Sequence, residues 1–521
     1  MAKHSYEEVR FLSLPAPEKH PSRIGAIARI MGLDAKPIET ASVLEIGCGA
    51  GDNILPIAAV YPNAKFVGID SSEKLITEAK KTAQSLGLEN ISFKTFIVGE
   101  SDEELGSFDY VLCFGMYSWV ASQVQDSLIK LISKTINETG LACISYNSFP
   151  GWNMRSSIRS IARTFDKDSR DAEERVHKTR ALLTAIKELQ IDDYSPYGQQ
   201  LREQLEFLES QSEGFIYHEI LGEHVSAVSI KDLADKLSDN FLHLNADARM
   251  SRMRFLSLNS EEARKSTKEI VTKKTTIAEL EQLADIVSPI SLRTSILSKN
   301  RTKNLDLNVV DKLYLASPLV ALSANPAVLG EGAEEFIDAR EYTQQETNSL
   351  MKGCIIFLSE IWPESVPLKD LIILTKNRWK LETSEEDLQY ARERFLSLAC
   401  MGLADFSLSR PLCLRHAGEF PISHPYARLQ AGGTKRVTNY RHEYSMLDDF
   451  QRIMISYLDG TRDIPAIQSA MVKAMLDGKL RITESGEAVK NPLEAETMVR
   501  DHTVEALRAL AEGALLTSES D

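Results

Sequence analysis

The chain has 521 residues, more than one hydrophobic core usually supports, so two or three domains are expected. Hydrophobic residues make up 43% of the chain and charged residues 26%, which is typical of a globular protein in water. The formal net charge of −15 argues against a nucleic-acid partner held through its phosphates, although charge alone identifies no partner.

The cysteines and the apolar segments indicate the compartment. The six cysteines are scattered without a CxxC pair, which predicts reduced thiols and neither a zinc site nor a disulfide framework. The first residues lack the apolar run of a signal peptide, and no stretch approaches the length of a membrane span. We therefore expect a cytoplasmic protein with no bound metal and no membrane insertion.

The first predicted elements are an amphipathic helix at 21–33 and a strand that runs into a glycine turn. Residues 43–51 read Val-Leu-Glu-Ile-Gly-Cys-Gly-Ala-Gly, and a helical pattern starts near Asn53. Such a turn brings the backbone close to a ligand, and the helix N-terminus behind it favours a carboxylate. A dinucleotide-binding turn would have glycine where Asp52 stands, and Glu45 would repel a pyrophosphate. An acid there suits a ligand with an ammonium and a sulfonium beside one carboxylate, as in S-adenosylmethionine.

The second predicted strand, at 63–70, ends in Asp70, where nucleotide-binding βαβ units place the acid that binds a ribose. A glycine turn inside some other α/β protein is the alternative, but acids and glycines in this order favour the cofactor. Strands and helices go on alternating, which predicts a parallel, doubly wound, Rossmann-like α/β sheet with its ligand at the carboxyl ends of the strands. The further elements are a helix at 72–87, strands at 91–98 and 108–114, a helix at 121–137 and a strand at 140–147.

The rest of the chain divides into further predicted regions. Residues 153–211 are charged and helix-periodic, which predicts a helical insertion packed over the sheet. A late strand at 241–246 would close a core that spans 1–255. Residues 256–304 are polar and then apolar, and we expect a connector with one or two helices there. Residues 305–521 are predicted to form a mainly helical C-terminal domain.

Within that C-terminal domain, residues 366–415 read as two helices followed by a short hairpin, which resembles a winged helix. Winged helices often bind DNA, but no basic recognition face accompanies this one. A role in protein contact is therefore expected.

Taken together, the residues resemble the class I S-adenosylmethionine-dependent methyltransferases. The resemblance is closer to the group that carries a methyltransferase regulatory domain, which includes the rickettsial outer-membrane-protein lysine methyltransferases, and it covers nearly the whole chain. The matching words beyond the glycine turn are Phe108-Asp109-Tyr110, Tyr117-Ser118-Trp119-Val120, Tyr146-Asn147, Pro150-Gly151-Trp152, Tyr217-His218-Glu219 and Tyr314-Leu315-Ala316-Ser317-Pro318-Leu319.

The resemblance implies cofactor contacts from the glycine turn, from the acids that follow the strands and from the loop after the fourth strand. The expected cofactor-binding residues are Glu45, Gly47, Cys48, Gly49, Gly51, Asp70, Ser71, Glu100 and Phe114. Glu100 follows the third strand, where many such enzymes place an acid on the adenine amino group. Its alternative is a solvated acid in the run 100–104. Phe114 stands before Gly115, where the group typically has histidine.

Aromatic and amide side chains follow the fourth and fifth strands and are candidates for an acceptor channel. Aromatic faces attract a sulfonium or an alkylammonium, and an asparagine carbonyl oxygen can hold an amine. The candidate catalytic residues are Tyr117, Trp119, Tyr146, Asn147, Trp152 and His218. A place in the core is the alternative for one of Tyr117 and Trp119. His218 and Glu219 could form a base pair or a lid contact, and ordinary hydrogen bonding is the alternative for the histidine.

We therefore expect an S-adenosylmethionine-dependent methyltransferase that acts on lysine side chains of a protein. One alternative is a small-molecule acceptor, and another is a cofactor-binding protein that serves as a sensor or an interaction module. A large extra domain favours a macromolecular acceptor. Since every cofactor motif lies in the first half of the chain, we expect residues 305–521 to select the substrate and to take no part in the chemistry.

Overall fold

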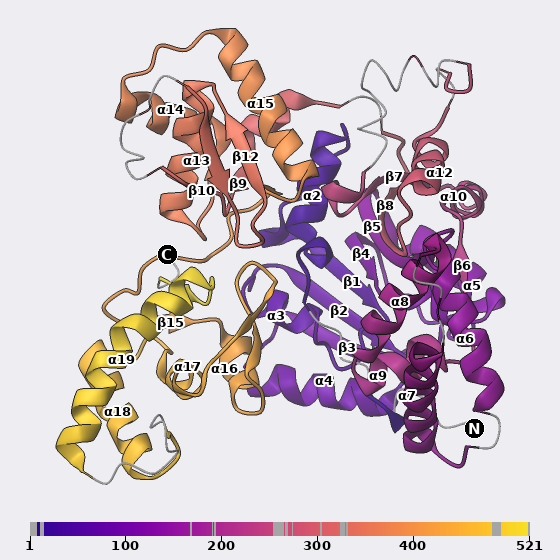
Figure 1. Cartoon of the computed structure of the whole chain (residues 1–521), viewed down its shortest axis with the longest axis horizontal. Coiled ribbons are helices and arrows are strands. Elements are labelled where there is room, and N and C mark those ends of the chain that lie inside the picture. The colour runs from indigo at the N-terminus through magenta and orange to yellow at the C-terminus, as the bar shows by residue number, and fades with distance from the viewer. Residues whose placement is uncertain are drawn as a thin grey trace.

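The structure is a computed structural model that describes residues 8–10, 15–166, 169–189, 191, 194–253, 265, 269–272, 275–302, 305–323, 329, 332–481 and 491–518. Figure 1 shows three parts. A large α/β sheet domain with its helical insertion lies on the right, a smaller part around α13–α15 at the upper left, and the C-terminal helices at the lower left.

The α/β domain is built on an eight-stranded sheet with the order β3-β2-β1-β4-β5-β8-β7, to which β6 adds beside β5. β1 lies between β2 and β4, and all pairs from β3 to β5 are parallel. β8 and β7 continue the sheet in antiparallel pairing. The strands are β1 (Ser42–Ile46), β2 (Lys65–Asp70), β3 (Ile91–Thr95), β4 (Phe108–Cys113), β5 (Ile136–Ser148), β6 (Ala227–Val228), β7 (His243–Asp247) and β8 (Leu292–Ser298).

Helices cover both faces of this sheet, as the predicted doubly wound fold requires. One apolar core contains side chains of α2 (Pro21–Ile30), α3 (Ile54–Ala58) and α4 (Glu73–Ser85). The core of the other face contains side chains of α5 (Ser122–Thr135) and α10 (Ile230–Ser238). The Rossmann-like fold is thereby confirmed, because strands such as β4 and β5 contribute alternate residues to the two cores.

The segment 256–304 differs from the expected helical connector. Its helix is present as α12 (Ile277–Val287), but the apolar run that follows forms β8, which lies inside the sheet between β5 and β7. The core therefore does not end at residue 255. The prediction was wrong here because a short apolar run has no periodicity that separates a buried strand from a buried helix. Most of 254–268 lies outside the described residues.

The helical insertion is present and extends beyond residue 211. It consists of α6 (Asn153–Phe165), α7 (Ala172–Glu188), α8 (Pro196–Glu209), α9 (Glu213–Phe215) and one π-helical turn at Ile216–Ile220. It has an apolar core of its own, in which Leu183, Leu205 and Ile220 are fully buried. The π-helical turn brings the insertion back to the carboxyl edge of the sheet.

The next part, 305–418, shares the core of the α/β domain, since Leu315 and Phe395 belong to the same apolar cluster as Ile24 of α2. The predicted helices of 366–415 are present, but the predicted hairpin is not, because β14 pairs with the distant β9 and residues 411–414 form no strand. The elements are β9 (Tyr314–Ala316), β10 (Val320–Ala321), β11 (Glu334–Ile337), β12 (Thr343–Glu346), α13 (Ser349–Ile361), β13 (Val366–Pro367), α14 (Leu368–Trp379), α15 (Glu385–Cys400) and β14 (Asp405–Ser407).

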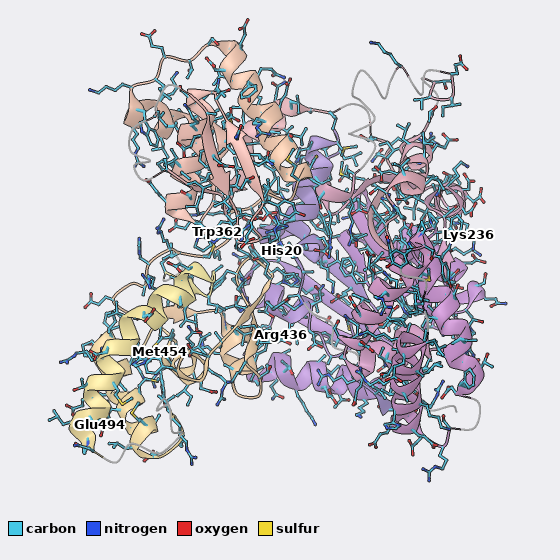
Figure 2. All side chains as sticks on the ribbon, in the orientation of Figure 1. His20, Lys236, Trp362, Arg436, Met454 and Glu494 are labelled. Carbon is cyan, nitrogen blue, oxygen red and sulfur yellow. The ribbon has the colours of Figure 1, made fainter. Side chains whose placement is uncertain are left out.

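The last part has a separate apolar core, to which its helices and the segments between them contribute. Its elements are β15 (Ile422–Ser423), α16 (Pro425–Ala431), the hairpin of β16 (Arg436–Thr438) and β17 (Tyr444–Met446), α17 (Asp449–Met454), α18 (Ile464–Leu476), α19 (Pro492–Glu512) and β18 (Leu516–Thr517). His20 and Trp362, labelled in Figure 2, lie near the middle of the molecule, where the three parts meet. Across the described residues, every helix is too short or too polar to span a bilayer.

Candidate active site

The glycine turn after β1 adopts a backbone that other residues rarely accept. Gly47, Gly49 and Gly51 all have positive φ, at 74°, 54° and 84°. The N–H groups of Gly47 and Cys48 donate to the carbonyl oxygen of Ile69, at 2.8 and 3.0 Å, and so tie the turn to the end of β2. No atom of the described residues lies within 4 Å of where a Gly49 side chain would start, so the backbone there faces open space. A ligand can approach this turn closely.

Asp70, the last residue of β2, holds the turn in place. Its carboxylate accepts the N–H of Gly49 and the N–H of Ser72, both at 2.9 Å. Each carboxylate oxygen has room for a further hydrogen bond. Ser71, beside it, also faces the cavity in front of the turn. That Asp70 contacts a ribose stays a prediction.

Glu45, in β1, is a buried acid with one unsatisfied oxygen. Only 3% of the residue is exposed, and its Oε1 accepts a hydrogen bond of 2.8 Å from Asn53 Nδ2. Its Oε2 has no hydrogen-bond partner among the described residues. Burial raises the pKa of Glu45 to about 8, although the Asn53 amide favours the charged form. A buried carboxylate with an unpaired oxygen is suited to a ligand that brings a positive charge.

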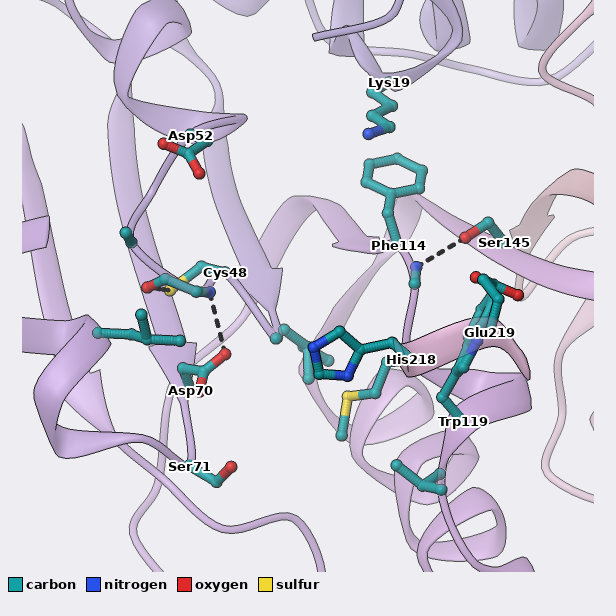
Figure 3. Close-up of a pocket in the computed structure, with 18 of the residues that line it drawn as sticks. Lys19, Cys48, Asp52, Asp70, Ser71, Phe114, Trp119, Ser145, His218 and Glu219 are labelled. Carbon is teal, nitrogen blue, oxygen red and sulfur yellow. Dashed lines mark hydrogen bonds between the residues drawn. The ribbon is translucent and has the colours of Figure 1, made fainter. Parts of the chain in front are cut away.

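A cavity of about 350 Å³ lies at the carboxyl ends of β1, β2, β4 and β5, where a doubly wound sheet binds its ligand. The close-up in Figure 3 shows Asp70 and Ser71 on one side and Trp119 and Glu219 on the other. The predicted site residues that line the cavity are Gly47, Cys48, Gly49, Asp70, Ser71, Phe114, Trp119, Asn147 and His218.

Three predicted acceptor-channel residues lie away from this lining and inside the protein. Tyr117 and Tyr146 are at most 1% exposed and belong to the apolar core that contains side chains of α5 and α10. Trp152 is equally buried. In β5, Ser145 and Asn147 line the cavity, so Tyr146 between them points to the opposite face. The structure thus agrees with the core alternative for Tyr117, and the expectation that Tyr146 and Trp152 line an acceptor channel is wrong.

Three predicted cofactor residues, Glu45, Gly51 and Glu100, also lie outside the described lining, and Glu45 is buried in β1 behind the glycine turn. Gly51 packs inside the turn, where an added side chain would begin 2.7 Å from Leu55. Glu100 is exposed in the turn after β3, while Phe96 and Val98 of the same segment line the cavity. The position of Glu100 agrees with the alternative of a solvated acid.

The sequence offers Glu219, together with His218, as a base pair or a lid contact, and its word Tyr217-His218-Glu219 carries no spacing that distinguishes the two roles. Glu219 belongs to the π-helical turn, a conformation that is frequent at functional sites. Burial raises the pKa of Glu219 to about 7, although the nearby Trp119 indole, Arg155 guanidinium and Asn147 amide favour the charged form. Asn147 Nδ2 is itself buried and, among the residues that the structure describes, meets no acceptor in hydrogen-bond geometry. A polar cluster thus closes the far end of the cavity.

Residues of the N-terminal segment also line the cavity. Lys19 lines it, with its Nζ 5.7 Å from the centroid of the Phe114 ring, and burial lowers the pKa of this lysine. The carbonyl oxygen of Val9 lies 2.7 Å from His218 Nε2, which makes His218 a contact between the insertion and the N-terminus.

The second half of the chain also reaches the site. Tyr426, in α16, donates a hydrogen bond of 3.2 Å to Asp52, which lines the cavity beside the glycine turn. The C-terminal half thus touches the wall of the cavity, while its taking no part in the chemistry stays a prediction. Contacts between segments so far apart in the sequence have no local signal.

Comparison with known proteins gives two matching families. A family described as methyltransferase domain matches residues 39–211, and one described as PKMT, C-terminal winged helix domain matches residues 419–515. The winged helix thus lies downstream of the predicted stretch 366–415.

Two relatives match over most of the chain, and a third matches less than half of it. PKMT2 from Rickettsia typhi, solved in complex with AdoHcy, superposes with a TM-score of 0.86 at 23% identity, over 98% of this chain and 100% of that one, which shows the same fold. The Rickettsia prowazekii protein RP789 is 27% identical over 95% of this chain and 90% of its own length. RP028 of the same organism is 34% identical over 42% of this chain and 88% of its own length.

Proposed function

This chain belongs to the S-adenosylmethionine-dependent methyltransferases that carry a PKMT-type C-terminal winged helix domain, and on that premise we propose that it methylates lysine side chains of a protein. The observation that carries the proposal is the buried Glu219 carboxyl at the end of the cavity opposite the glycine turn. We place the enzyme in the cytoplasm of a bacterium, in keeping with its rickettsial relatives.

The residues at the glycine turn fit the cofactor. When bound, S-adenosylmethionine supplies a methyl group on a sulfonium sulfur. An amine that attacks the methyl carbon in line displaces the sulfur, and S-adenosylhomocysteine is released. The unpaired Oε2 of Glu45 suits the cofactor's ammonium, and the open space before Gly49 admits its methionine end. We assign Asp70 and Ser71 to the ribose and the apolar Phe96 and Val98 to the adenine, because all four line the cavity.

The polar cluster at the far end suits a lysine ammonium. A carboxylate at Glu219 attracts the ammonium, and the Asn147 carbonyl oxygen can accept one of its hydrogens. Phe114 and Trp119 supply aromatic faces along the way, which attract the alkylammonium and exclude water. The amine must lose a proton before it attacks, and desolvation beside a sulfonium lowers its pKa from about 10.4. With a pKa of about 7, Glu219 can receive that proton and pass it to solvent at neutral pH.

The proposal is tested with S-adenosylmethionine that carries a labelled methyl group, incubated with a bacterial lysate and the purified protein. We expect label in protein, released as methyllysine after complete hydrolysis, and little label with a Glu219→Gln variant that still binds S-adenosylhomocysteine. Free lysine and RNA in the same lysate serve as internal controls. Label confined to small molecules or to RNA would overturn lysine methylation of proteins as the function.

We further propose that residues 305–521 select the protein substrate. The winged helix has its own apolar core and offers a surface beside the cofactor site. The acidic chain would attract a lysine-bearing partner electrostatically. A chain that ends at 418 should lose more activity on the protein acceptor than on a short lysine peptide, and equal losses on both would contradict substrate selection.

A further inference from the structure

The tip of the β16–β17 hairpin, at residues 439–443, is buried against the α/β domain. A hairpin of this kind usually projects into solvent, but here Asn439, Arg441 and His442 are at most 5% exposed. The rings of His442 and His20 lie 5.6 Å apart between centroids, so the tip reaches the start of α2. The hairpin belongs to the segment that matches the winged helix domain.

His442 is linked to Glu45 by two buried hydrogen bonds. The distance between His442 Nε2 and Asn53 Oδ1 is 2.9 Å, and Asn53 Nδ2 donates to Glu45 Oε1 at 2.8 Å. Since the Asn53 amide nitrogen is turned to the carboxylate, its oxygen faces His442, and the imidazole must donate. Within the described residues, Asn53 is the hydrogen-bond donor to Glu45. His442 thus fixes the Asn53 amide, which in turn holds the Glu45 carboxylate.

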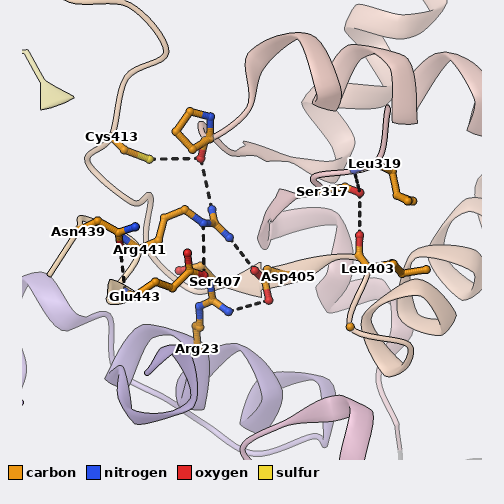
Figure 4. Close-up of polar contacts among 12 residues, drawn as sticks. Arg23, Ser317, Leu319, Leu403, Asp405, Ser407, Cys413, Asn439, Arg441 and Glu443 are labelled. Atoms are coloured by element: carbon orange, nitrogen blue, oxygen red, sulfur yellow. Dashed lines mark hydrogen bonds and ion pairs between the residues drawn. The ribbon is translucent and has the colours of Figure 1, made fainter. Parts of the chain in front are cut away.

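The hairpin tip is rigidly anchored, which Figure 4 shows. Arg441 donates to Asp405 at 2.6 Å, and the side chain of Asn439 accepts the N–H groups of Arg441 and Glu443 at 3.0 and 2.9 Å. His442 itself has a φ of 57°, in the left-handed region that favours glycine and asparagine. A backbone held in such a conformation persists only where its surroundings determine it.

Burial also keeps the imidazole neutral. It lowers the pKa of His442 well below its usual range, and the nearby His20, Lys19, His424 and Arg23 lower it further. A neutral imidazole has one N–H to give, and this one is given to Asn53.

We propose that His442 is a positioning residue for the cofactor site, through which the winged helix domain sets the affinity of the α/β domain for S-adenosylmethionine. Without the imidazole, the Asn53 amide is free to turn, and the Glu45 carboxylate behind the glycine turn loses its hydrogen-bond donor. Tyr426, which donates to Asp52, is a second tie between the same domain and the same turn. The proposal rests on the cofactor site and not on the acceptor, so its failure would leave lysine methylation untouched.

The first experiment measures the affinity of the full chain for S-adenosylhomocysteine by calorimetry. His442→Ala should weaken binding about tenfold, as the loss of a buried hydrogen bond implies. It should raise the KM for S-adenosylmethionine and leave kcat and the KM for the acceptor unchanged. Met446→Ala, at a 60% exposed position of the same hairpin, is the matched control and should bind as the wild type does.

Two conservative variants separate the hydrogen bond from the backbone. Glutamine places an amide N–H about as far from the backbone as the imidazole N–H, whereas asparagine is shorter but tolerates positive φ better. The proposal predicts that His442→Gln restores affinity to within about threefold of wild type and that His442→Asn does not. A purely structural role would give the opposite order, and that order would overturn the proposal.

A double-mutant cycle completes the test. If His442 acts through Asn53, the variants His442→Ala and Asn53→Ala weaken binding of S-adenosylhomocysteine by similar factors. The double variant then binds as tightly as the single variant with the larger loss. Thermal unfolding of each variant shows that it is folded under the conditions of the titration. Factors that multiply in the double variant would show that the two residues act independently and would refute the coupling.

Discussion

The rings of Tyr117 and Tyr146 meet edge to face in the core, with 6.5 Å between their centroids. The hydroxyl of Tyr146 also lies 3.0 Å from that of Ser295, across the pair β5 and β8. The two tyrosines thus support the sheet beneath the site, and Trp119 is the aromatic residue of the same turn that faces the cavity.

This arrangement predicts that substitutions of Tyr117 and Tyr146 lower stability, whereas a substitution of Trp119 lowers turnover. Tyr117→Ala and Tyr146→Ala should each lower the free energy of unfolding by about 3–5 kcal/mol, because each leaves a cavity in a closed core. Trp119→Ala should change stability little and lower turnover roughly tenfold. Urea unfolding and initial rates on an identified acceptor check both. Full activity in Trp119→Ala would return this residue to a structural role.

Asp70 should matter to the cofactor in two ways, through direct contact and through the glycine turn. Asp70→Ala removes the acceptor of the Gly49 and Ser72 N–H groups and should weaken binding of S-adenosylhomocysteine by roughly 1.5–3 kcal/mol. Asp70→Asn keeps one acceptor oxygen and should lose less. Calorimetry on both variants tests this, and an unchanged affinity in Asp70→Ala would exclude the assignment.

Cofactor binding should release a proton at neutral pH. Without the cofactor, Glu45 has a pKa of about 8 and is mostly protonated at pH 7, whereas a bound ammonium favours its charged form. Affinity should therefore rise with pH up to about 8 and then level off. Calorimetry at pH 7 in buffers of different ionisation enthalpy measures the released proton.

The variant Glu45→Gln is the control and should show no such release of a proton.

The raised pKa of Glu45 also has a consequence for stability. The folded protein holds the Glu45 proton up to about pH 8, while the unfolded chain loses it above its usual pKa of 4.5. The contribution of Glu45 to the free energy of unfolding therefore falls as pH rises through this window, and Glu45→Gln should abolish the fall.

The acceptor side should titrate separately, with Glu219. Its pKa of about 7 means that the carboxylate which attracts a lysine ammonium forms as pH rises through neutrality. The kcat/KM for the acceptor should rise through an inflection near pH 7, and Glu219→Gln should lack it. Rates between pH 6 and 8.5 at saturating cofactor give the profile, and an inflection that persists in the variant would assign it to another group.

The glycine turn at the cavity and the acid that ends β2 were predictable from the sequence because their signals are local. Glu45, the glycine turn and Asp70 stand in one βαβ unit whose order carries the information. The face that Tyr146 presents was not predictable, since alternation gives two faces without saying which one meets the ligand. His442 and β8 had no local signal either, because their partners Asn53 and β5 are distant in the sequence.

The place of β8 in the sheet bears on how the chain folds as it is made. Ala142 of β5 pairs with Leu297 of β8, so the edge of β5 stays open until the later strand has left the ribosome. During that interval the nascent chain exposes backbone groups and the buried faces of β5 to other strands. Pairing between such distant segments is slow to form, and we expect the intermediate without β8 to be the species that chaperones bind and that aggregates when synthesis outpaces folding.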